Sequence, residues 1–385
     1  MKAHERILGY PIYLLGKLID RICMQKNESK VFFFFPFYHT GGAERVHTDI
    51  LRELSLKKPW VIVVNKSQNE HHKSSMMQYA KLIDIGRFFH NWVKFFVKNF
   101  FIGYYSSLIN RHKSSILISS LNGFFTDIVP YVKDAYKIEI IHGFYGIEPI
   151  IHIRPTKYLD KRILVSKNSE NELHKLYDDW GVDSRYKQRT SVIHNAVQIP
   201  IPMPVKKYDD GLKVVFIGRN SREKRYYLYE RIAAECKENG FDAQFYSIGR
   251  FKASKAVISI GEICTREELY RILSEFHILI LCSLSEGFPI VILEAMACAL
   301  VPISTNVGGV AEVISDGVTG NLLNSSEDDV VVSEIVCLLN HYCKKPHLLQ
   351  EMGIAAYTRV MENFNYETFG EKYRALIKEA FDETS

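Results

Sequence analysis

The sequence predicts an α/β fold made of two doubly wound, Rossmann-like domains, each a parallel sheet covered by helices. Three observations support this prediction. The chain has 385 residues, which is too long for one ordinary core and suits two domains. Short apolar runs alternate with helical segments, as in sheets built from βαβ units. The alternation pauses at the proline-rich segment Ile199–Val205, which suits neither a sheet interior nor a helix and which we interpret as a linker.

We predict an N-terminal domain over residues 1–200 and a C-terminal domain over residues 201–365. The strands expected in the first domain are Lys30–Pro36, Trp60–Val64, Ser115–Ser119, Ile138–Ile141, Arg162–Ser166 and Val192–His194. The strands expected in the second domain are Val214–Ile217, Ala243–Ser247, Ala256–Ile260, His277–Leu281 and Val301–Ser304. We expect the two sheets to face each other across a cleft, because ligands of open α/β sheets bind beyond the carboxyl ends of the strands.

Composition narrows the classes of function and the compartment. Apolar residues make up 47% of the chain and charged residues 24%, as in soluble globular proteins. The 49 Lys and Arg residues barely exceed the 44 Asp and Glu residues, and so small an excess does not indicate nucleic-acid binding. Seven cysteines without a C-x-x-C pair indicate buried free thiols in a reducing compartment.

The N-terminus is expected to belong to a mature, cytoplasmic chain. No apolar run reaches the roughly 18–20 residues that are needed to span a bilayer. The first apolar segment is broken by Gly9, Pro11, Gly16 and Lys17, and no small-residue cleavage site follows it, which argues against a signal peptide.

The segment Ser283–Gly317 carries the clearest sign of function. The apolar run His277–Cys282 predicts a buried strand that ends in a polar turn with Glu286. A helix is expected to start near Pro289, because a fixed φ and a missing N–H suit the first helical position. Unsatisfied first-turn amides and the helix dipole make such a place an anion site. With Glu286 in the turn and Glu294 inside the helix, the arrangement suits a nucleotide-sugar, whose diphosphate is flanked by hydroxyls.

A longer pattern surrounds these two carboxylates. Glu286-x7-Glu294 lies within S-E-G-F-P-I-V-I-L-E-A-M-A and is followed by G-G-V-A-E at Gly308–Glu312. This combination resembles the donor-site signature of retaining GT-B glycosyltransferases of the group 1, family 4 type. The resemblance implies the GT-B fold, sugar transfer with retention at the anomeric carbon, and a C-terminal helix at 366–385 that packs back on the first domain. The implied donor is a UDP- or GDP-sugar.

The resemblance also implies roles for the residues of the donor turn. Glu286 is expected to bind the sugar hydroxyls and to fix the orientation of the donor, and Glu294 is expected to bind the nucleotide ribose. The remaining donor-binding positions in this turn are Gly287, Phe288 and Pro289. The backbone of Gly308–Glu312 is expected to help bound the same pocket.

A basic loop follows the predicted strand Val214–Ile217. Gly218 and Arg219 end that strand, and Lys224 lies five residues further on. Arg can grip a diphosphate through two hydrogen bonds, and Lys adds a point charge, so both suit a leaving group whose charge grows as the glycosidic bond breaks. The loop resembles the G-R-x(n)-K element of the family, which implies catalytic roles for Arg219 and Lys224 and donor binding by Gly218. The neighbours expected to be merely solvated are Ser221, Arg222 and Arg225.

Two further candidates lie in the N-terminal half. Gly41 and Gly42 follow the first strand and open a helix, where a backbone without side chains can come close to a ligand. By resemblance to the family's G-G-x-E-R motif, Gly42 should lie at the donor phosphates. His142 follows a predicted strand, where a lone histidine is more often structural; the resemblance implies a catalytic position beside the transferred sugar.

No metal ion and no cofactor are expected. The chain lacks the Asp-x-Asp triplet with which nucleotide-sugar enzymes of another fold hold a divalent cation on the diphosphate. Arg219, Lys224 and helix amides are expected to replace the metal. The elements Val165–Lys167 and Ile193–Val197 also match the family pattern, with Ala196 where glycine is usual, and both are interpreted as framework.

The acceptor is expected to be a saccharide or a lipid-linked saccharide, in the synthesis of a bacterial surface polysaccharide or lipopolysaccharide. Ile7–Ile22 has apolar residues at near-helical spacing with Arg6, Lys17 and Arg21 around them, and Arg87–Tyr105 is rich in aromatic residues and lysine. Such segments suit the interface of an anionic membrane. Core helices of the first domain are an equally good interpretation.

Three other functions remain as alternatives. A nucleotide-sugar epimerase would share the two-domain architecture but would need no acceptor. A catalytically dead carbohydrate-binding homologue is the non-enzyme alternative, against which the retained Glu286, Glu294, Arg219 and Lys224 argue. A dehydrogenase is disfavoured, because no G-x-G-x-x-G follows the first strand of either half.

Overall fold

The computed structural model describes residues 3–23, 29–89, 93–120, 122–144, 146–263 and 265–384, with the backbone alone for residues 3–7. The chain divides into two compact units. Unit 1 comprises Met1–Val165, Ser169–Ile193 and Gly370–Ser385. Unit 2 comprises Ser166–Asn168 and His194–Phe369.

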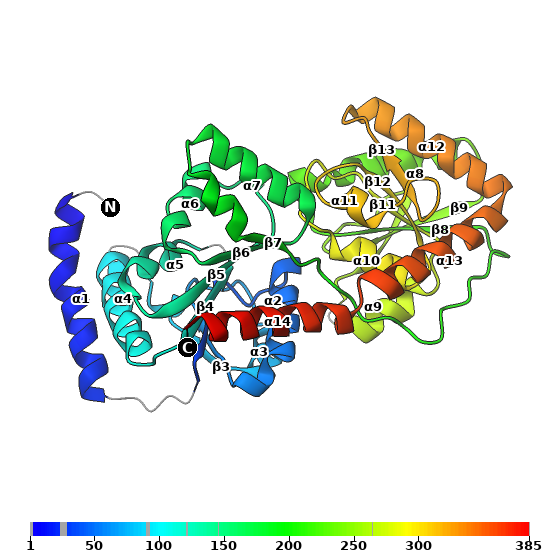
Figure 1. Ribbon diagram of the computed structural model, residues 1–385. Coiled ribbons are helices and arrows are strands. Elements are labelled where there is room, and N and C mark those ends of the chain that lie inside the picture. Colours follow the sequence, from blue (N-terminus) through cyan, green and yellow to red (C-terminus); the bar gives the residue numbers. More distant parts are fainter. Residues whose placement is uncertain are drawn as a thin grey trace. The chain divides into compact units, whose positions relative to one another are not determined.

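Unit 1 is built on a parallel sheet of seven strands in the order β3-β2-β1-β4-β5-β6-β7 (Figure 1). The strands are β1 (Val31–Phe35), β2 (Trp60–Val63), β3 (Lys81–Asp84), β4 (Ser115–Ser120), β5 (Ala135–Ile141), β6 (Lys161–Leu164) and β7 (Thr190–Val192). Five of the six strands predicted in this unit are confirmed, the predicted Val192–His194 overlaps β7 only at Val192, and β3 was missed. β1 is wholly buried because its V-F-F-F-F run meets apolar side chains on both faces of the sheet.

Helices flank this sheet, and α1 packs on α4 (Figure 1). The helices are α1 (Ala3–Cys23), α2 (Gly42–Glu53), α3 (Lys73–Tyr79), α4 (Lys94–Asn110), α5 (Gly123–Ile128), α6 (Pro149–Ile153), α7 (Lys167–Asp179) and α14 (Tyr366–Thr384). The part of α14 from Gly370 onward belongs to unit 1, where Arg374 Nη1 contacts Glu53 Oε2 at 2.5 Å and Lys161 Nζ contacts Glu379 Oε1 at 3.0 Å.

α1 and α4 lie side by side (Figure 1). The backbones of the two helices touch at two glycines. A Cβ built on Gly16 would lie 2.1 Å from the Phe100 carbonyl oxygen, and a Cβ built on Gly103 would lie 1.9 Å from the Tyr13 carbonyl oxygen. The buried Asp20 carboxylate accepts hydrogen bonds from the Arg111 guanidinium and fixes the far end of α1. Gly16 and Gly103 are therefore the points at which the backbones of α1 and α4 meet.

The two segments suggested as membrane contacts differ in burial. The second half of α4 presents Ile102 and Tyr105 to the core beside Phe34 and Phe125, whereas Lys94 and Phe96 near its start are exposed. α1 exposes an apolar face instead, made of Leu8, Tyr10, Leu14, Leu15, Leu18 and Ile22. Residues 90–92 and the Arg6 and Ile7 side chains lie outside the described part of the chain.

Unit 2 is built on a parallel sheet of six strands in the order β10-β9-β8-β11-β12-β13. The strands are β8 (Leu212–Ile217), β9 (Ala243–Ile248), β10 (Val257–Gly261), β11 (Ile278–Leu281), β12 (Val301–Thr305) and β13 (Asn321–Leu323). The helices are α8 (Tyr226–Glu238), α9 (Arg266–Leu273), α10 (Ile290–Ala297), α11 (Val310–Val313), α12 (Asp328–Lys344) and α13 (Pro346–Asn363). Chain order reverses between β8 and β11, and ligands of doubly wound sheets bind at such a switch point.

Unit 2 begins at His194, ahead of the proline-rich segment. The Val197 N–H donates to the Phe364 carbonyl at 3.0 Å, and the Tyr357 hydroxyl donates to the Pro200 carbonyl at 2.8 Å. These hydrogen bonds attach the start of the predicted linker to unit 2.

Within the described residues, no helix is long and apolar enough to cross a membrane. Six described cysteines are free thiols, of which Cys236, Cys282 and Cys298 are buried. Burial raises the pKa of each of these three thiols to about 12, so they are unreactive near neutral pH. Cys23 and Cys337 are exposed, unlike the buried thiols that the sequence suggested.

Candidate active site

The predicted donor turn joins β11 to α10 in unit 2. Pro289 is the residue before the helix, with ψ at 109°, and the helix begins at Ile290. The turn is fixed from beneath by the Thr305 hydroxyl, which donates to the Ser283 carbonyl at 2.6 Å. Phe288 is buried against the ring of His194, with centroids 4.7 Å apart. Its carbonyl accepts a hydrogen bond from Asn195 Nδ2 at 3.0 Å.

Glu286 and Lys224 meet in this turn although they lie 62 residues apart. Lys224 Nζ donates to Glu286 Oε1 at 2.6 Å, and the Ser283 hydroxyl donates to the same oxygen at 2.6 Å. Both side chains are largely shielded, at 17% and 9% exposure. Two residues that the sequence assigned to different parts of the donor are thus one ion pair at the carboxyl ends of β8 and β11.

Backbone hydrogen bonds hold the two loops of this pair together. The Leu284 N–H donates to the Glu223 carbonyl at 2.8 Å, and the Lys224 N–H donates to the Ser221 carbonyl at 3.1 Å. Lys224 closes a short 3-10 turn that begins at Arg222. Backbone hydrogen bonds of Lys224 and of the preceding residue, Glu223, therefore fix the position of the lysine.

Arg225 is a correction to the sequence analysis, which expected a solvated neighbour. Its backbone is left-handed, with φ 47° and ψ 46°, and the residue is 2% exposed. The guanidinium donates to the Cys282 and Ser326 carbonyls at 2.5 and 2.8 Å and pairs with Asp328 at 3.0 Å. Arg225 therefore fastens the basic loop to the end of β11 and to the start of α12.

Arg219 pairs with Glu223 of its own loop and not with Glu286. Its side chain is 74% exposed, and its guanidinium lies 3.7 Å from Glu223 Oε1, four residues along. Gly218, before it, donates its N–H to the Ile248 carbonyl at 3.2 Å and so ends the sheet pairing of β8. Exposure on a short loop leaves the Arg219 side chain able to change partners.

Gly308 and Gly309 pack directly on the donor turn. A Cβ on Gly308, whose φ is 57°, would lie 1.7 Å from the Glu286 carbonyl oxygen. The Gly309 N–H donates to the Gly287 carbonyl at 2.9 Å. No other residue fits at Gly308 without moving the turn, which explains why glycines stand here.

Glu294 lies on α10 and is only 1% exposed, which places a carboxylate beneath the turn. Its assignment to the nucleotide ribose stays a prediction. Within the described residues, no group of three or more His, Cys, Asp or Glu side chains is arranged to hold a metal ion.

Glu312 serves the framework of unit 2. Its two carboxylate oxygens accept the Lys167 and Asn168 N–H groups at 2.8 and 2.9 Å, and His194 Nε2 lies 2.9 Å from Oε2. Burial tends to raise the pKa of Glu312, but the hydrogen bonds from His194, Lys167 and Asn168 outweigh it and hold the pKa below the ordinary 4.5.

We expect Glu312→Gln to lower the free energy of unfolding by about 1–3 kcal/mol at neutral pH, because the glutamine NH₂ faces a backbone N–H that loses its acceptor. A depressed carboxyl pKa stabilises the fold above pH 4.5, and this contribution is lost as the pH falls below that value. Urea unfolding should therefore show the variant and the parent converging in acid. Glu362→Gln, at an exposed position, is the matched control and should change little.

Unit 1 holds the remaining candidates. Gly42 is the first residue of α2, and the Arg45 N–H donates to the Gly41 carbonyl at 3.2 Å. His142 directly follows β5, and its Nε2 lies 3.1 Å from Nε2 of His47, on α2. His47 is fully buried and stacks on Phe35, with ring centroids 3.9 Å apart.

The sequence analysis missed His47, which contacts His142. Burial lowers the pKa of His142 to about 4 and holds the pKa of His47 well below its usual value. Both rings are therefore neutral near pH 7, and one nitrogen of the pair donates while the other accepts. The signal in the sequence was a histidine on the apolar face of α2, beside Val46 and Ile50.

The sequence is similar to proteins of one family. Residues 211–341 match the family model described as Glycosyl transferases group 1. The chain is 31% identical over 284 residues to alpha-maltose-1-phosphate synthase of Mycolicibacterium smegmatis, an overlap that covers 63% of this chain and 71% of that protein.

The fold is similar to that of solved structures. Anabaena HepE in complex with UDP and glucose superposes with a TM-score of 0.71 at 14% identity, over 91% of this chain and 99% of that one. The apo form of the lipopolysaccharide outer core galactosyltransferase WaaB gives a TM-score of 0.69 at 15% identity, over 91% and 99%. At these identities the likeness concerns the fold.

Proposed function

This chain belongs to the group 1 glycosyltransferases and has the GT-B fold, and from this premise we propose that it moves a sugar from a nucleoside diphosphate-sugar to an acceptor hydroxyl. The observation that carries the proposal is the Lys224–Glu286 ion pair at the switch point of the unit 2 sheet. It sets a cation and a sugar-binding carboxylate beside the N-terminus of α10, where the diphosphate of a donor would lie.

The donor is a uridine diphosphate hexose or N-acetylhexosamine. The structural neighbour HepE, which is in complex with UDP and glucose, supports this class of donor. We expect UDP to raise the thermal unfolding temperature more than GDP does at equal concentration, because the nucleotide with the lower Kd stabilises the fold more. A ligand at about 100 times its Kd adds about 2.7 kcal/mol to the free energy of unfolding. A larger shift with GDP would contradict the choice of base, and no shift with either nucleotide would contradict donor binding altogether.

The proposed reaction proceeds with retention. Lys224 changes partner from Glu286 to the diphosphate, and Glu286 then accepts hydrogen bonds from the sugar hydroxyls. The bond from the anomeric carbon to the diphosphate oxygen breaks, and its electron pair stays with the diphosphate. The acceptor oxygen forms its bond on the face that the diphosphate leaves, and a diphosphate oxygen takes the acceptor proton. Arg219 moves from Glu223 onto the same leaving group.

His142 supports this step as a neutral hydrogen-bonding group. Its low pKa keeps it uncharged near pH 7, so it contributes a directed hydrogen bond to the donor sugar and no positive charge. Gly42, at the start of α2, offers a first-turn amide to the donor phosphates.

The acceptor is a saccharide, free or lipid-linked, in the synthesis of a bacterial surface polysaccharide or lipopolysaccharide. WaaB, a lipopolysaccharide galactosyltransferase, is a structural neighbour that supports this setting. The exposed leucines and Ile22 of α1, with Lys17 and Arg21 on the same helix, support a peripheral contact with the inner face of an anionic membrane.

A single assay tests the proposal against its rivals. The purified protein is incubated with UDP-N-acetylglucosamine and UDP-glucose, with and without a membrane lipid extract. UDP release with the sugar on a lipid or saccharide product supports transfer. Conversion of the donor to an isomer without any acceptor would instead identify an epimerase, and binding without turnover of any kind would identify a dead homologue.

A further inference from the structure

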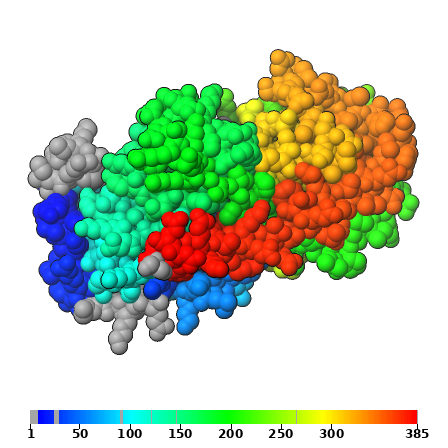
Figure 2. All heavy atoms as spheres, in the orientation of Figure 1, coloured from blue at the N-terminus to red at the C-terminus, as the bar shows by residue number. Residues whose placement is uncertain are grey.

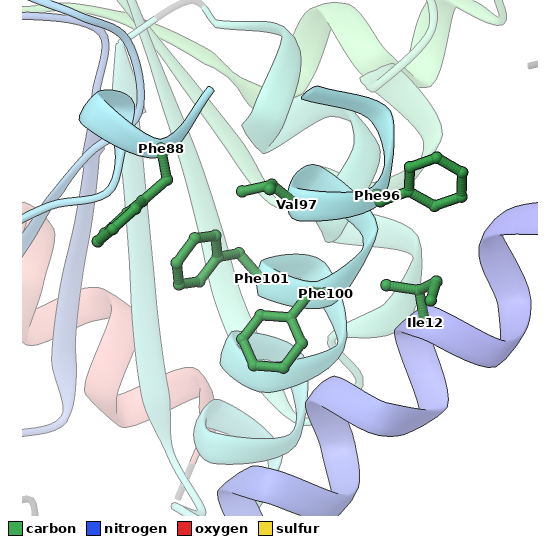
Figure 3. A pocket seen from close by; sticks show the side chains of 6 residues that line it. All are labelled: Ile12, Phe88, Phe96, Val97, Phe100 and Phe101. Carbon is green, nitrogen blue, oxygen red and sulfur yellow. The ribbon is translucent and has the colours of Figure 1, made fainter. Parts of the chain in front are cut away.

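An apolar pocket of about 320 Å³ lies between α1 and α4 in unit 1. Its lining consists of Ile12 from α1, Phe96, Val97, Phe100 and Phe101 from α4, and Phe88 from the short turn before α4. Figure 3 shows Ile12 directed from α1 toward Phe96 and Phe100, with Phe88 on the other side of Phe101. Every lining side chain is hydrocarbon, so the pocket cannot recognise a sugar, a phosphate or a nucleotide base through hydrogen bonds.

The pocket is a built feature, because the two helices that form it are fixed against each other. The backbone of α1 meets α4 at Gly16, next to the Phe100 carbonyl, and Phe100 also lines the pocket. Further along, the Asp20–Arg111 hydrogen bonds hold the end of α1. At Gly16 the backbones of α1 and α4 are already in contact, so the helices cannot approach further. The aromatic side chains of α4 beside this contact form the pocket wall.

The mouth of the pocket joins the exposed apolar face of α1. Leu8 and Leu15 lie one helical turn on either side of Ile12 and are 61% and 46% exposed. Figure 2 shows the blue α1 beside the cyan α4 at the surface of unit 1. Phe88 and Phe96, which line the pocket, are themselves 45% and 47% exposed. The pocket is therefore open on the side that the apolar face occupies.

Two exposed basic side chains lie beside the pocket wall, where Lys98 is already paired with Asp127. The Arg87 guanidinium lies over the Phe88 ring, 4.8 Å from its centroid, and Lys94 is exposed one turn before Val97. No Asp or Glu occurs in the sequence from residue 85 to residue 110. An apolar pocket under a cationic rim complements a molecule with a hydrocarbon tail and an anionic head.

We propose that this pocket holds the end of one acyl chain of an anionic bilayer phospholipid while α1 lies on the membrane surface. The inference rests on the membrane contact proposed above and adds a specific site to it. The chain enters beside Ile12 and lies against the α4 phenylalanines, and Arg87 and Lys94 face the phosphate of the headgroup. One lipid drawn partly out of the bilayer would thereby fix the orientation of α1 and hold unit 1 at the surface from which a lipid-linked acceptor is taken.

Photo-crosslinking tests the site on the full-length protein. Vesicles of phosphatidylglycerol and phosphatidylcholine contain a trace of phosphatidylglycerol with a diazirine at the end of one acyl chain. Crosslinks are mapped by mass spectrometry. Ile12→Trp and Val97→Phe each fill the pocket, from α1 and from α4 respectively. Leu18→Trp adds the same ring to an exposed position of α1 outside the pocket and is the matched control.

The proposal expects crosslinks on the peptide that contains Phe96–Phe101. Their yield should fall by about tenfold in both filled variants, since extra volume in an occupied site is strongly disfavoured. The yield should stay unchanged in Leu18→Trp, and cosedimentation with the vesicles should persist in all of these variants. Circular dichroism and thermal unfolding identify any variant that has lost its fold, and either filled variant suffices.

Three results would overturn the proposal. The first is an undiminished yield in both folded, filled variants, and the second is crosslinks confined to the exposed leucines of α1. The third is a dimer in solution that Leu15→Lys dissociates, because the apolar face would then belong to a second copy of the chain. Turnover of donor in detergent with a soluble acceptor is measured in parallel. In the parent protein, absence of the pocket crosslink with turnover intact refutes the pocket alone, and a pocket crosslink without turnover refutes the proposed function alone.

Discussion

Lys224→Met is expected to lower kcat for sugar transfer by on the order of 10²–10³-fold, as happens when one preorganised group that stabilises developing charge is removed. The methionine retains most of the side-chain length but has no charge to offer a departing diphosphate. The KM for the donor should change much less, because the loss concerns charge that develops in the transition state. Steady-state kinetics with a UDP-sugar and a saccharide acceptor measures both quantities.

Glu286→Gln separates the two members of the pair. The glutamine preserves shape but cannot balance Lys224 or accept the same hydrogen bonds from sugar hydroxyls, so both kcat and donor affinity should fall. Arg231→Met is the matched control, since Arg231 is a partly exposed cation of unit 2 that pairs with Asp329. Near-normal turnover in both Lys224→Met and Glu286→Gln would refute the assignment of the site.

The stability of the same variants tests whether the pair exists in solution. Each single substitution leaves a shielded charge without its partner, and we expect it to cost about 1–3 kcal/mol of the free energy of unfolding. The double variant removes both charges, so it should be more stable than the sum of the single losses predicts. Additive losses would mean that Lys224 and Glu286 do not touch in the folded protein.

The strands that the sequence revealed most clearly share one physical property. Buried parallel strands such as β1 and β11 are short, continuous apolar runs, and burial on both faces requires such runs. The two strands that were missed, β3 and β13, lie at the sheet edges and read K-L-I-D and N-L-L. Their pairing depends on the neighbouring strand, which composition within a four-residue window cannot reveal.

The site divides in a similar way. Glu286 and Gly308 were predictable because their spacing forms a recognisable pattern, whereas the ion pair with Lys224 needed the fold to align two loops. Arg225 was misjudged because its burial depends on a left-handed backbone and on acceptors at Cys282 and Ser326. A basic residue in a basic loop gives no sign of this in the sequence.

Acid is expected to destabilise the protein through the His47–His142 pair. Both histidines have native pKa values below the unfolded value of 6.5, with that of His142 at about 4, because burial disfavours the charged rings. A depressed pKa means that the unfolded chain binds the proton more readily. The contribution of the pair to stability is therefore complete above pH 6.5 and is lost as the pH falls from 6.5 toward 4.

The variant that isolates this effect is His47→Phe. Phenylalanine can keep the stack on Phe35 while it removes one titrating ring and the 3.1 Å contact with His142. The free energy of unfolding, measured with urea at a series of pH values, should then fall less steeply below pH 6.5 than in the parent. His152 and His277, whose pKa values burial also lowers to about 4, contribute equally to both proteins and cancel in the difference.

His341→Gln, on the exposed side of α12, is the control and should leave the pH dependence of stability as in the parent. Parallel curves for His47→Phe and the parent would show that the pKa of His47 is the same in the native and unfolded states, which would contradict a pKa lowered by burial. The neutral state of both histidines also affects the expected pH dependence of kcat. Because neither ring gains a proton until the pH falls well below 6.5, protonation of His142 cannot be what limits kcat near neutral pH. A loss of turnover between pH 7 and pH 6 that His142→Asn abolishes would therefore contradict a neutral His142 in the native enzyme.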